Sequence, residues 1–218
     1  MALLNKQAWS DQHELTFRLW LERAECELLS GDFEKAEQLI GELLQRGASD
    51  VEFADASCLK INLHVMTGEH PLAIDSALGC LRRFGIDLPA HPTIEQVRAE
   101  HEAVWQALNG RLIESLIDLP LMTDPKMQAA MQVLSVLAGP ATFTDLQLFC
   151  LLACRMVNVS IQHGMGGASA YAYACLGLSL ERTFTVTAKV TAWPDLPATW
   201  WKSMPSPPTA RRSTMRWD

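Results

Sequence analysis

The sequence predicts an all-α fold in which helical hairpins stack into an α-solenoid. Three observations favour this fold class: apolar residues recur at helical spacing, short turns with a central glycine interrupt them, and one hairpin pattern occurs twice, offset by 37 residues. Two amphipathic helices joined by a short turn cannot bury their apolar faces alone. Copies of such a hairpin therefore pack side by side around a common core.

The first copy of the hairpin starts with an apolar stripe at spacings of four, three and four residues. This stripe consists of Phe17, Leu21, Ala24 and Leu28. The turn Ser30-Gly31-Asp32 ends the helix, and a second helix runs up to Gly47, where we expect a left-handed cap residue. The apolar residues of the second helix are Phe33, Ala36, Leu39, Ile40, Leu43 and Leu44.

The second copy repeats this pattern with small or apolar residues at nearly every matching position. Its first stripe is Ala54, Cys58, Ile61 and Val65, its break is Thr67-Gly68-Glu69, and its second stripe is His70, Ala73, Ser76, Ala77, Cys80 and Leu81. The offset is close to the tetratricopeptide (TPR) length of about 34 residues. Residues 31–36 and 68–73 resemble the turn and the small residue that begin the second helix of a TPR. The predicted solenoid is therefore TPR-like.

A linker and a third, irregular hairpin are expected after these two copies. Residues 84–92 contain two prolines, which restrict the backbone and remove donors, and they predict a rigid connection. Thr93 caps a helix that Asn109-Gly110 ends. Residues 112–118 form its brief partner helix.

Three longer helices complete the pattern. Thr123-Asp124-Pro125 starts the first, and Gly139-Pro140 is expected to end it. The second opens at Thr144-Asp145 and stops at His163-Gly164. The third spans residues 168–180.

Composition narrows the possible partners and the compartment. A net charge of −7 and a pI near 5.4 argue against nucleic acid as a partner, because phosphate binding requires a basic surface. The start of the chain lacks a secretion signal, so we expect a cytoplasmic protein. Gly139-Pro140, Asp145 and Arg155 divide the apolar region 129–161 into runs too short for a membrane span. The six cysteines fall in helical patterns and are expected to be reduced core residues.

No motif in the sequence predicts catalysis, a cofactor, a metal site or a small-molecule substrate. The phosphate-binding loop of P-loop enzymes and the motifs of protein kinases do not occur. His13 and His101 are candidate phosphate acceptors, but the favoured interpretation is that they are solvated histidines on helices. Cys150 and Cys154 are one helical turn apart, and core packing is favoured over a shared metal. Residues 164–167 are expected to be a loop between helices rather than a nucleotide-binding turn.

Three residues are candidates for binding a partner protein: Trp20, Trp105 and Arg155. Large aromatic residues and arginine are enriched in the energetically important parts of protein interfaces. The alternative for the tryptophans is packing between repeats. The alternative for Arg155 is an ion pair with a carboxylate such as Asp145 or Asp124.

Several irregular loop motifs resemble a known family. These motifs are residues 85–92, residues 118–125, Ala129-Ala130-Met131, Arg155-Met156-Val157-Asn158 and His163-Gly164. They resemble the helical region of bacterial signalling proteins described as trifunctional Ser/Thr kinase, AAA-type ATPase and sensor histidine kinase. In that family the kinase and ATPase domains precede the helical region, and a GAF domain and a histidine kinase follow it. The resemblance covers residues 14–182.

The expected organisation is a short N-terminal lead (residues 1–13), a TPR-like helical repeat domain (14–182) and a tail (183–218). The tail holds five of the eleven prolines and four of the seven tryptophans, with no glycine or glutamate, so we expect it to be disordered and frameshifted. The favoured function is a non-catalytic scaffold, a fragment that couples neighbouring domains of a signalling kinase or ATPase. A free-standing TPR-like adaptor is the first alternative, and an enzyme with an unrecognised site is the second.

Overall fold

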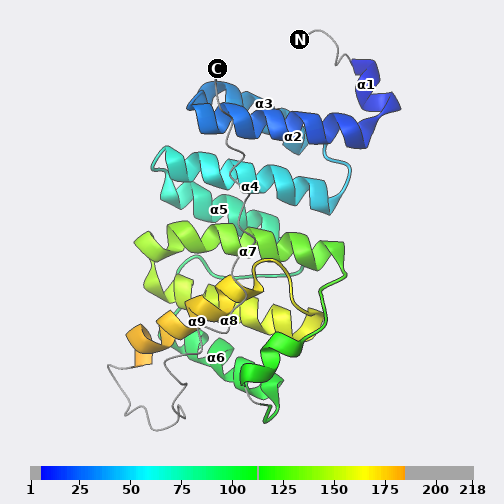
Figure 1. Ribbon diagram of the computed structural model, residues 1–218. Helices are drawn as coiled ribbons and strands as arrows, with labels where there is room; N and C mark the ends of the chain where they lie inside the picture. Colours follow the sequence, from blue (N-terminus) through cyan, green and yellow to red (C-terminus); the bar gives the residue numbers. More distant parts are fainter. Residues whose placement is uncertain (1–5, 112, 185–218) are drawn as a thin grey trace, which may run out of the picture.

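The computed structural model describes residues 6–111 and 113–184, and the secondary-structure elements of this part of the chain are helices joined by loops (Figure 1). The elements are α1 (Lys6–Asp11), α2 (His13–Ser30), α3 (Phe33–Arg46), α4 (Asp50–Met66), α5 (His70–Arg82), α6 (Ile94–Leu108), the 3-10 helix η1 (Ile113–Asp118), α7 (Pro125–Thr144), α8 (Leu146–His163) and α9 (Ser169–Phe184). The predicted all-α class is confirmed for the described residues. Apart from residues 183 and 184, the tail for which disorder and a frameshift are expected lies outside them.

The two expected hairpins are formed by α2 with α3 and by α4 with α5. Gly31 has φ +84°, a left-handed conformation that glycine adopts without steric cost, and the Asp32 side chain accepts from the backbone N–H of Lys35 to cap α3. The expected left-handed cap at Gly47 is wrong, because this residue has φ −56°. The chain instead extends from Gly47 toward Ser49, which caps α4.

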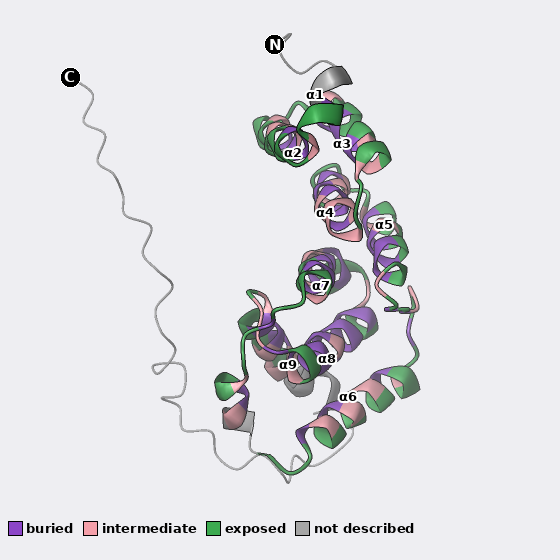
Figure 2. Ribbon diagram, turned by 90° about the vertical axis from the view of Figure 1, so that its right-hand side faces the viewer, coloured by how far each residue is buried: buried purple, intermediate pink, exposed green. Residues whose placement is uncertain are grey.

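The third layer differs from the expected hairpin of α6 and η1. α7 packs against α4 and α5, α8 packs on α7, and α6 packs against α8 at the opposite end of the stack from α2 and α3 (Figures 1 and 2). The burial pattern explains this order. α7 and α8 bury side chains around most of their circumference, whereas α6 buries one stripe consisting of Val97, Val104 and Leu108. The more apolar pair therefore takes the central position.

α7 continues through Gly139-Pro140 to Thr144, so the expected stop at this pair is wrong. A proline has no backbone N–H, so Pro140 cannot donate to the carbonyl oxygen of Val136 one turn earlier. The hydroxyl of Thr142 donates to the carbonyl oxygen of Ala138 at 2.7 Å, and that of Thr144 donates to the carbonyl oxygen of Pro140 at 2.8 Å. Pro140 itself is buried.

Two apolar cores hold the stack together, and α4 contributes to both. The N-terminal core joins α1, α2, α3 and one face of α4, which supplies Ala56, Leu59 and Leu63. The larger core extends from the other face of α4 to α9, and here α4 supplies Ala54, Cys58 and Ile61. Burial of both faces explains why α4 is apolar around most of its circumference.

Candidate interaction surfaces and inter-helix contacts

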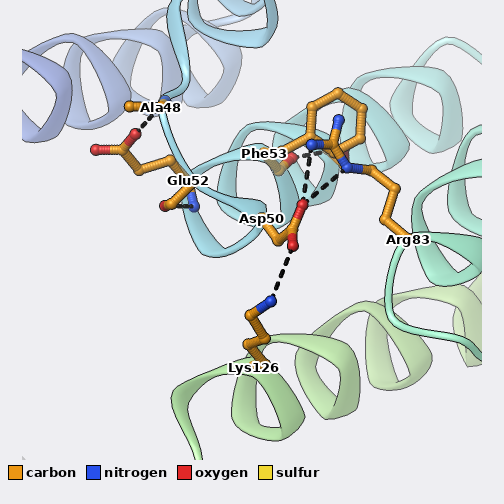
Figure 3. Close-up of polar contacts among 8 residues, drawn as sticks. Ala48, Asp50, Glu52, Phe53, Arg83 and Lys126 are labelled. Carbon is orange, nitrogen blue, oxygen red and sulfur yellow. Dashed lines mark hydrogen bonds and ion pairs between the residues drawn. The ribbon is translucent and has the colours of Figure 1, made fainter.

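Asp50, the first residue of α4, connects three helices of the second and third layers (Figure 3). Its Oδ1 accepts from Arg83 Nε at 3.1 Å and Nη2 at 2.9 Å, and its Oδ2 accepts from Lys126 Nζ at 3.2 Å. Arg83 follows α5, and its guanidinium carbon lies 4.1 Å from the centroid of the Phe53 ring. One carboxylate thus fixes the start of α4 to the end of α5 and the start of α7.

Hydrogen bonds from Arg83 and then Lys126 hold the pKa of Asp50 below its usual range. A carboxyl whose pKa is lower in the folded protein stabilises the fold above its unfolded pKa. That stabilisation is lost as the pH falls through the folded pKa. The contribution of Asp50 is therefore complete at neutral pH and disappears in acid.

Replacing Asp50 by asparagine is expected to lower the Tm by about 1–3 °C at pH 7, the modest effect typical of a solvent-accessible ion pair. The difference between the wild type and D50N should shrink as the pH falls toward 3, because the wild-type carboxyl becomes protonated. Thermal melts followed by circular dichroism at both pH values measure this change. D87N, which removes the exposed carboxylate near Arg82 at 3.3 Å, is the matched control. A difference independent of pH would contradict the role given to the charge of Asp50.

The first hairpin is tied to α4 by Glu52. The His13 Nε2 atom at the start of α2 lies 3.1 Å from Glu52 Oε2, and the same carboxylate oxygen accepts from the backbone N–H of Ala48 at 2.6 Å. Figure 3 shows the contact between Glu52 and Ala48 beside Asp50. His13 is therefore a partly buried, paired residue, and not the solvated histidine expected from the sequence.

Arg155 on α8 forms an ion pair, as one of the two predictions for it proposed, but its carboxylate is Glu100 on α6. Arg155 Nη2 donates to Glu100 Oε2 at 2.8 Å, and Asn158 Nδ2 donates to Glu100 Oε1 at 2.8 Å. The two carboxylates suggested by the sequence have other contacts. Asp124 caps α7 through the N–H of Lys126, and Asp145 caps α8 and lies 3.0 Å from His91 Nδ1. The Glu100 cluster joins α6 to α8, and a partner-binding role for Arg155 stays a prediction.

The two candidate tryptophans differ in their surroundings. Trp20 is partly buried in the N-terminal core, and its ring centroid lies 5.6 Å from that of Trp9 in α1. Trp105 is 40% exposed near the end of α6, and its indole Nε1 donates to His101 Nε2 at 3.0 Å. Burial lowers the pKa of His101, which favours the neutral ring that can accept this bond. Of these two residues, Trp105 offers a partner more surface.

Trp9 is a core residue that the sequence reading missed. It is buried, and the guanidinium carbon of Arg46 lies 5.0 Å from its ring centroid. The lead of residues 1–13 therefore contains a short helix that packs on the first hairpin. A lone tryptophan four residues before the end of the expected lead was the available signal.

Five of the six cysteines and the glycine-rich loop have the surroundings expected of structural residues, but Cys26 is exposed, so the expectation of a core position is wrong for it. Cys150 and Cys154 are buried in the core, and burial raises the pKa of Cys154 to about 12. No group of three potential metal ligands occurs among the residues that the structure describes. In the loop between α8 and α9, Met165 N donates to the carbonyl oxygen of Pro120 at 2.7 Å, and Met122 N donates to that of Met165 at 2.8 Å. This loop fastens the segment before α7 to the end of α8.

Two helices expose apolar side chains. On α9, Tyr171 and Leu178 are exposed. α2 also has a second apolar line opposite the buried one. The sequence analysis did not predict it, although its residues recur at helical spacing. This line consists of Leu15 (54% exposed), Leu19 (43%), Cys26 and Leu29 (72%). Within the described range, no helix is both long and apolar enough to span a membrane.

The fold and these contacts define a class: a stack of helices whose polar side chains connect one layer to the next. No family model matches the chain, and no solved structure matches it. The chain is similar to a segment of the hybrid signal transduction histidine kinase G of Dictyostelium discoideum. The two are 17% identical over an alignment of 187 residues, which covers 78% of this chain and 5% of that protein. The similarity supports a loose link to signal-transduction kinases, and the bacterial family stays a prediction.

Proposed function

We propose that this chain is a non-catalytic scaffold that couples neighbouring domains of a signal-transduction protein or binds a partner protein. The observation that carries the proposal is the set of contacts centred on Asp50, which joins the ends of three helices from two layers. A displacement at one layer is passed to the next through such contacts, because packed helices move as rigid bodies. Glu52 and Glu100 connect further pairs of helices in the same way.

Two findings support the proposal of a scaffold in a signalling protein. The similar segment belongs to a protein described as a signal transduction histidine kinase, and the aligned region is a small part of that protein. The stacked pairs α2–α3 and α4–α5 fit a TPR-like α-solenoid, the form that we propose for the whole array. A cytoplasmic location, and the place of the chain between an ATPase module and a kinase module, are parts of the same proposal.

A free-standing adaptor is the second candidate, and the exposed apolar line on α2 favours it. Adaptors of stacked helices bind partners through surfaces left uncovered by the stack. The two functions differ in how the partner is connected to the chain. Both are non-catalytic.

The scaffold function predicts that the full chain neither hydrolyses ATP nor becomes phosphorylated. Purified protein is incubated with Mg²⁺ and γ-labelled ATP, and released phosphate and protein-bound label are measured at neutral and alkaline pH, where phosphohistidine survives. We expect both signals to equal those of a no-protein blank. Label that disappears in H13Q or H101Q would identify a phosphate acceptor and refute the non-catalytic proposal.

A further inference from the structure

The exposed face of α2 combines apolar side chains with carboxylates that have no ion-pair partner among the described residues. We call the α2 face the surface formed by Leu15, Leu19, Glu22, Glu25, Cys26 and Leu29. All six residues are exposed. The other charged residues of α2 itself are paired, for example Arg18 with Glu14 at 3.2 Å and Arg23 with Glu27 at 3.7 Å.

The spacing of these residues makes the α2 face one continuous strip. Leu15, Leu19, Cys26 and Leu29 follow one another at intervals of four, seven and three residues, so they lie along one side of the helix. Glu22 lies within this line, one turn from both Leu19 and Cys26, and Glu25 lies beside it, one turn before Leu29. The line covers 14 residue steps, a length of about 21 Å.

This strip has the dimensions and chemistry of a helix-packing surface. An exposed apolar line of this length along a helix is matched by the apolar stripe of a second helix lying beside it. Carboxylates within and beside the line select positive charges at the facing positions of the second helix, because negative charges at those positions would be repelled. The α2 face is therefore complementary to a basic amphipathic helix.

We propose that the α2 face binds one basic amphipathic helix of a partner protein. The apolar stripe of that helix covers the three leucines, and its lysine or arginine side chains pair with Glu22 and Glu25. A second copy of this chain is a poorer occupant, because it would bring the same carboxylates together across the interface. An anionic membrane surface is repelled for the same reason. The proposal deepens the scaffold function and rests on it.

The binding test uses two 18-residue fluorescent peptides with the same helical pattern of leucines. One carries lysine at every polar position, and the other carries glutamate. Fluorescence anisotropy with the full chain is expected to show that the lysine peptide binds at least about tenfold more tightly, because its charges oppose those of the α2 face. Equal binding of the two peptides would overturn the proposal.

Matched variants locate the binding on the molecule. E22Q/E25Q should weaken binding of the lysine peptide about fivefold, which corresponds to the loss of two exposed ion pairs. E34Q/E37Q removes the same charge from two exposed carboxylates on α3 that form no ion pair with the residues that the structure describes, and it should change binding less than about twofold. L19A/L29A should weaken binding at least about tenfold through lost apolar burial. Alanine favours helix, so this variant is expected to fold. Equal effects of the two glutamine variants would show that the peptide binds by net charge alone.

Cys26 supplies a readout that depends on position. It is exposed, whereas the other five cysteines are buried, and so iodoacetamide should modify Cys26 first. Saturating lysine peptide is expected to slow this modification about fivefold or more, as followed by mass spectrometry of the intact chain. An unchanged rate would place the peptide elsewhere and overturn the proposal.

Sedimentation of the full chain tests the alternative occupant. Dimers that are lost in L19A/L29A would show that a second copy of this chain binds the α2 face. Neither outcome alters the ATP measurement, so the two proposals fail separately.

Discussion

Replacing Gly164 by alanine is expected to lower the Tm by about 5–12 °C. Gly164 follows α8 with φ +100° and ψ 176°, a conformation that is open essentially to glycine alone. A Cβ atom there would lie 2.5 Å from the carbonyl oxygen of Pro120 and 3.0 Å from the backbone of Leu121 and Met122. The backbone conformation alone costs about 1–3 kcal/mol, and the clash pushes the two segments apart.

Thermal melting of G164A measures this effect, with G167A as the control. Gly167 belongs to the same loop, has no positive φ, and a Cβ atom added to it meets no atom within 4 Å. G167A is therefore expected to melt within about 1 °C of the wild type. Similar melting of the two variants would show that the loop does not press against the segment before α7.

Tryptophan in place of Ala36 or Ala73 is expected to abolish cooperative melting of the core that surrounds it. Both alanines are 0% exposed, Ala36 in the N-terminal core and Ala73 in the larger one. Overpacking a filled core costs about 1–3 kcal/mol or more, and an added indole exceeds what rotamer changes can absorb. A36W should disturb α1 to α4, whereas A73W should disturb the layers from α4 onward.

Circular dichroism and near-ultraviolet spectra of both variants measure these losses. A99W places the same side chain on an exposed position of α6 and is expected to keep the wild-type melt. If A36W or A73W melts like the wild type, the replaced alanine does not face its hairpin partner. The two variants also test whether the cores are separable.

The sequence predicted the helix boundaries where local chemistry decides them. Thr93 and Gln96 form the reciprocal capping box at the start of α6, and Asp145 caps α8 by accepting from two backbone N–H groups. Predictions failed where tertiary packing decides how far a helix continues or which helix it packs against. The continuation through Pro140 and the position of α6 beyond α8 depend on which apolar faces meet, and the spacing of residues along the chain does not contain that information.

The residues proposed to bind a partner show the same difference between what the local sequence predicts and what packing determines. The sequence identified Arg155 as a residue that needs a carboxylate, but Glu100 lies 55 positions away and became its partner only through the packing of α6 on α8. Trp20 and Trp105 were both candidates, and packing separates them: Trp20 lies against Trp9 in the N-terminal core, whereas Trp105 is 40% exposed. The α2 face, in contrast, could have been found from the helical spacing of Leu15, Leu19 and Leu29.

The sharing of α4 between two cores has a consequence for how force passes along the stack. Pulling the first hairpin away bares Leu59 and Leu63 on one face of α4 while Ala54 and Ile61 on the other face stay covered. α4 therefore lies between the first hairpin, which can separate from it, and the larger core, which stays packed against its other face. Tension applied near the N-terminus would peel α2 and α3 as one step before reaching the layers that follow. In a linker between moving domains, the layers of helices would therefore separate in a fixed order, with the first hairpin separating before the others.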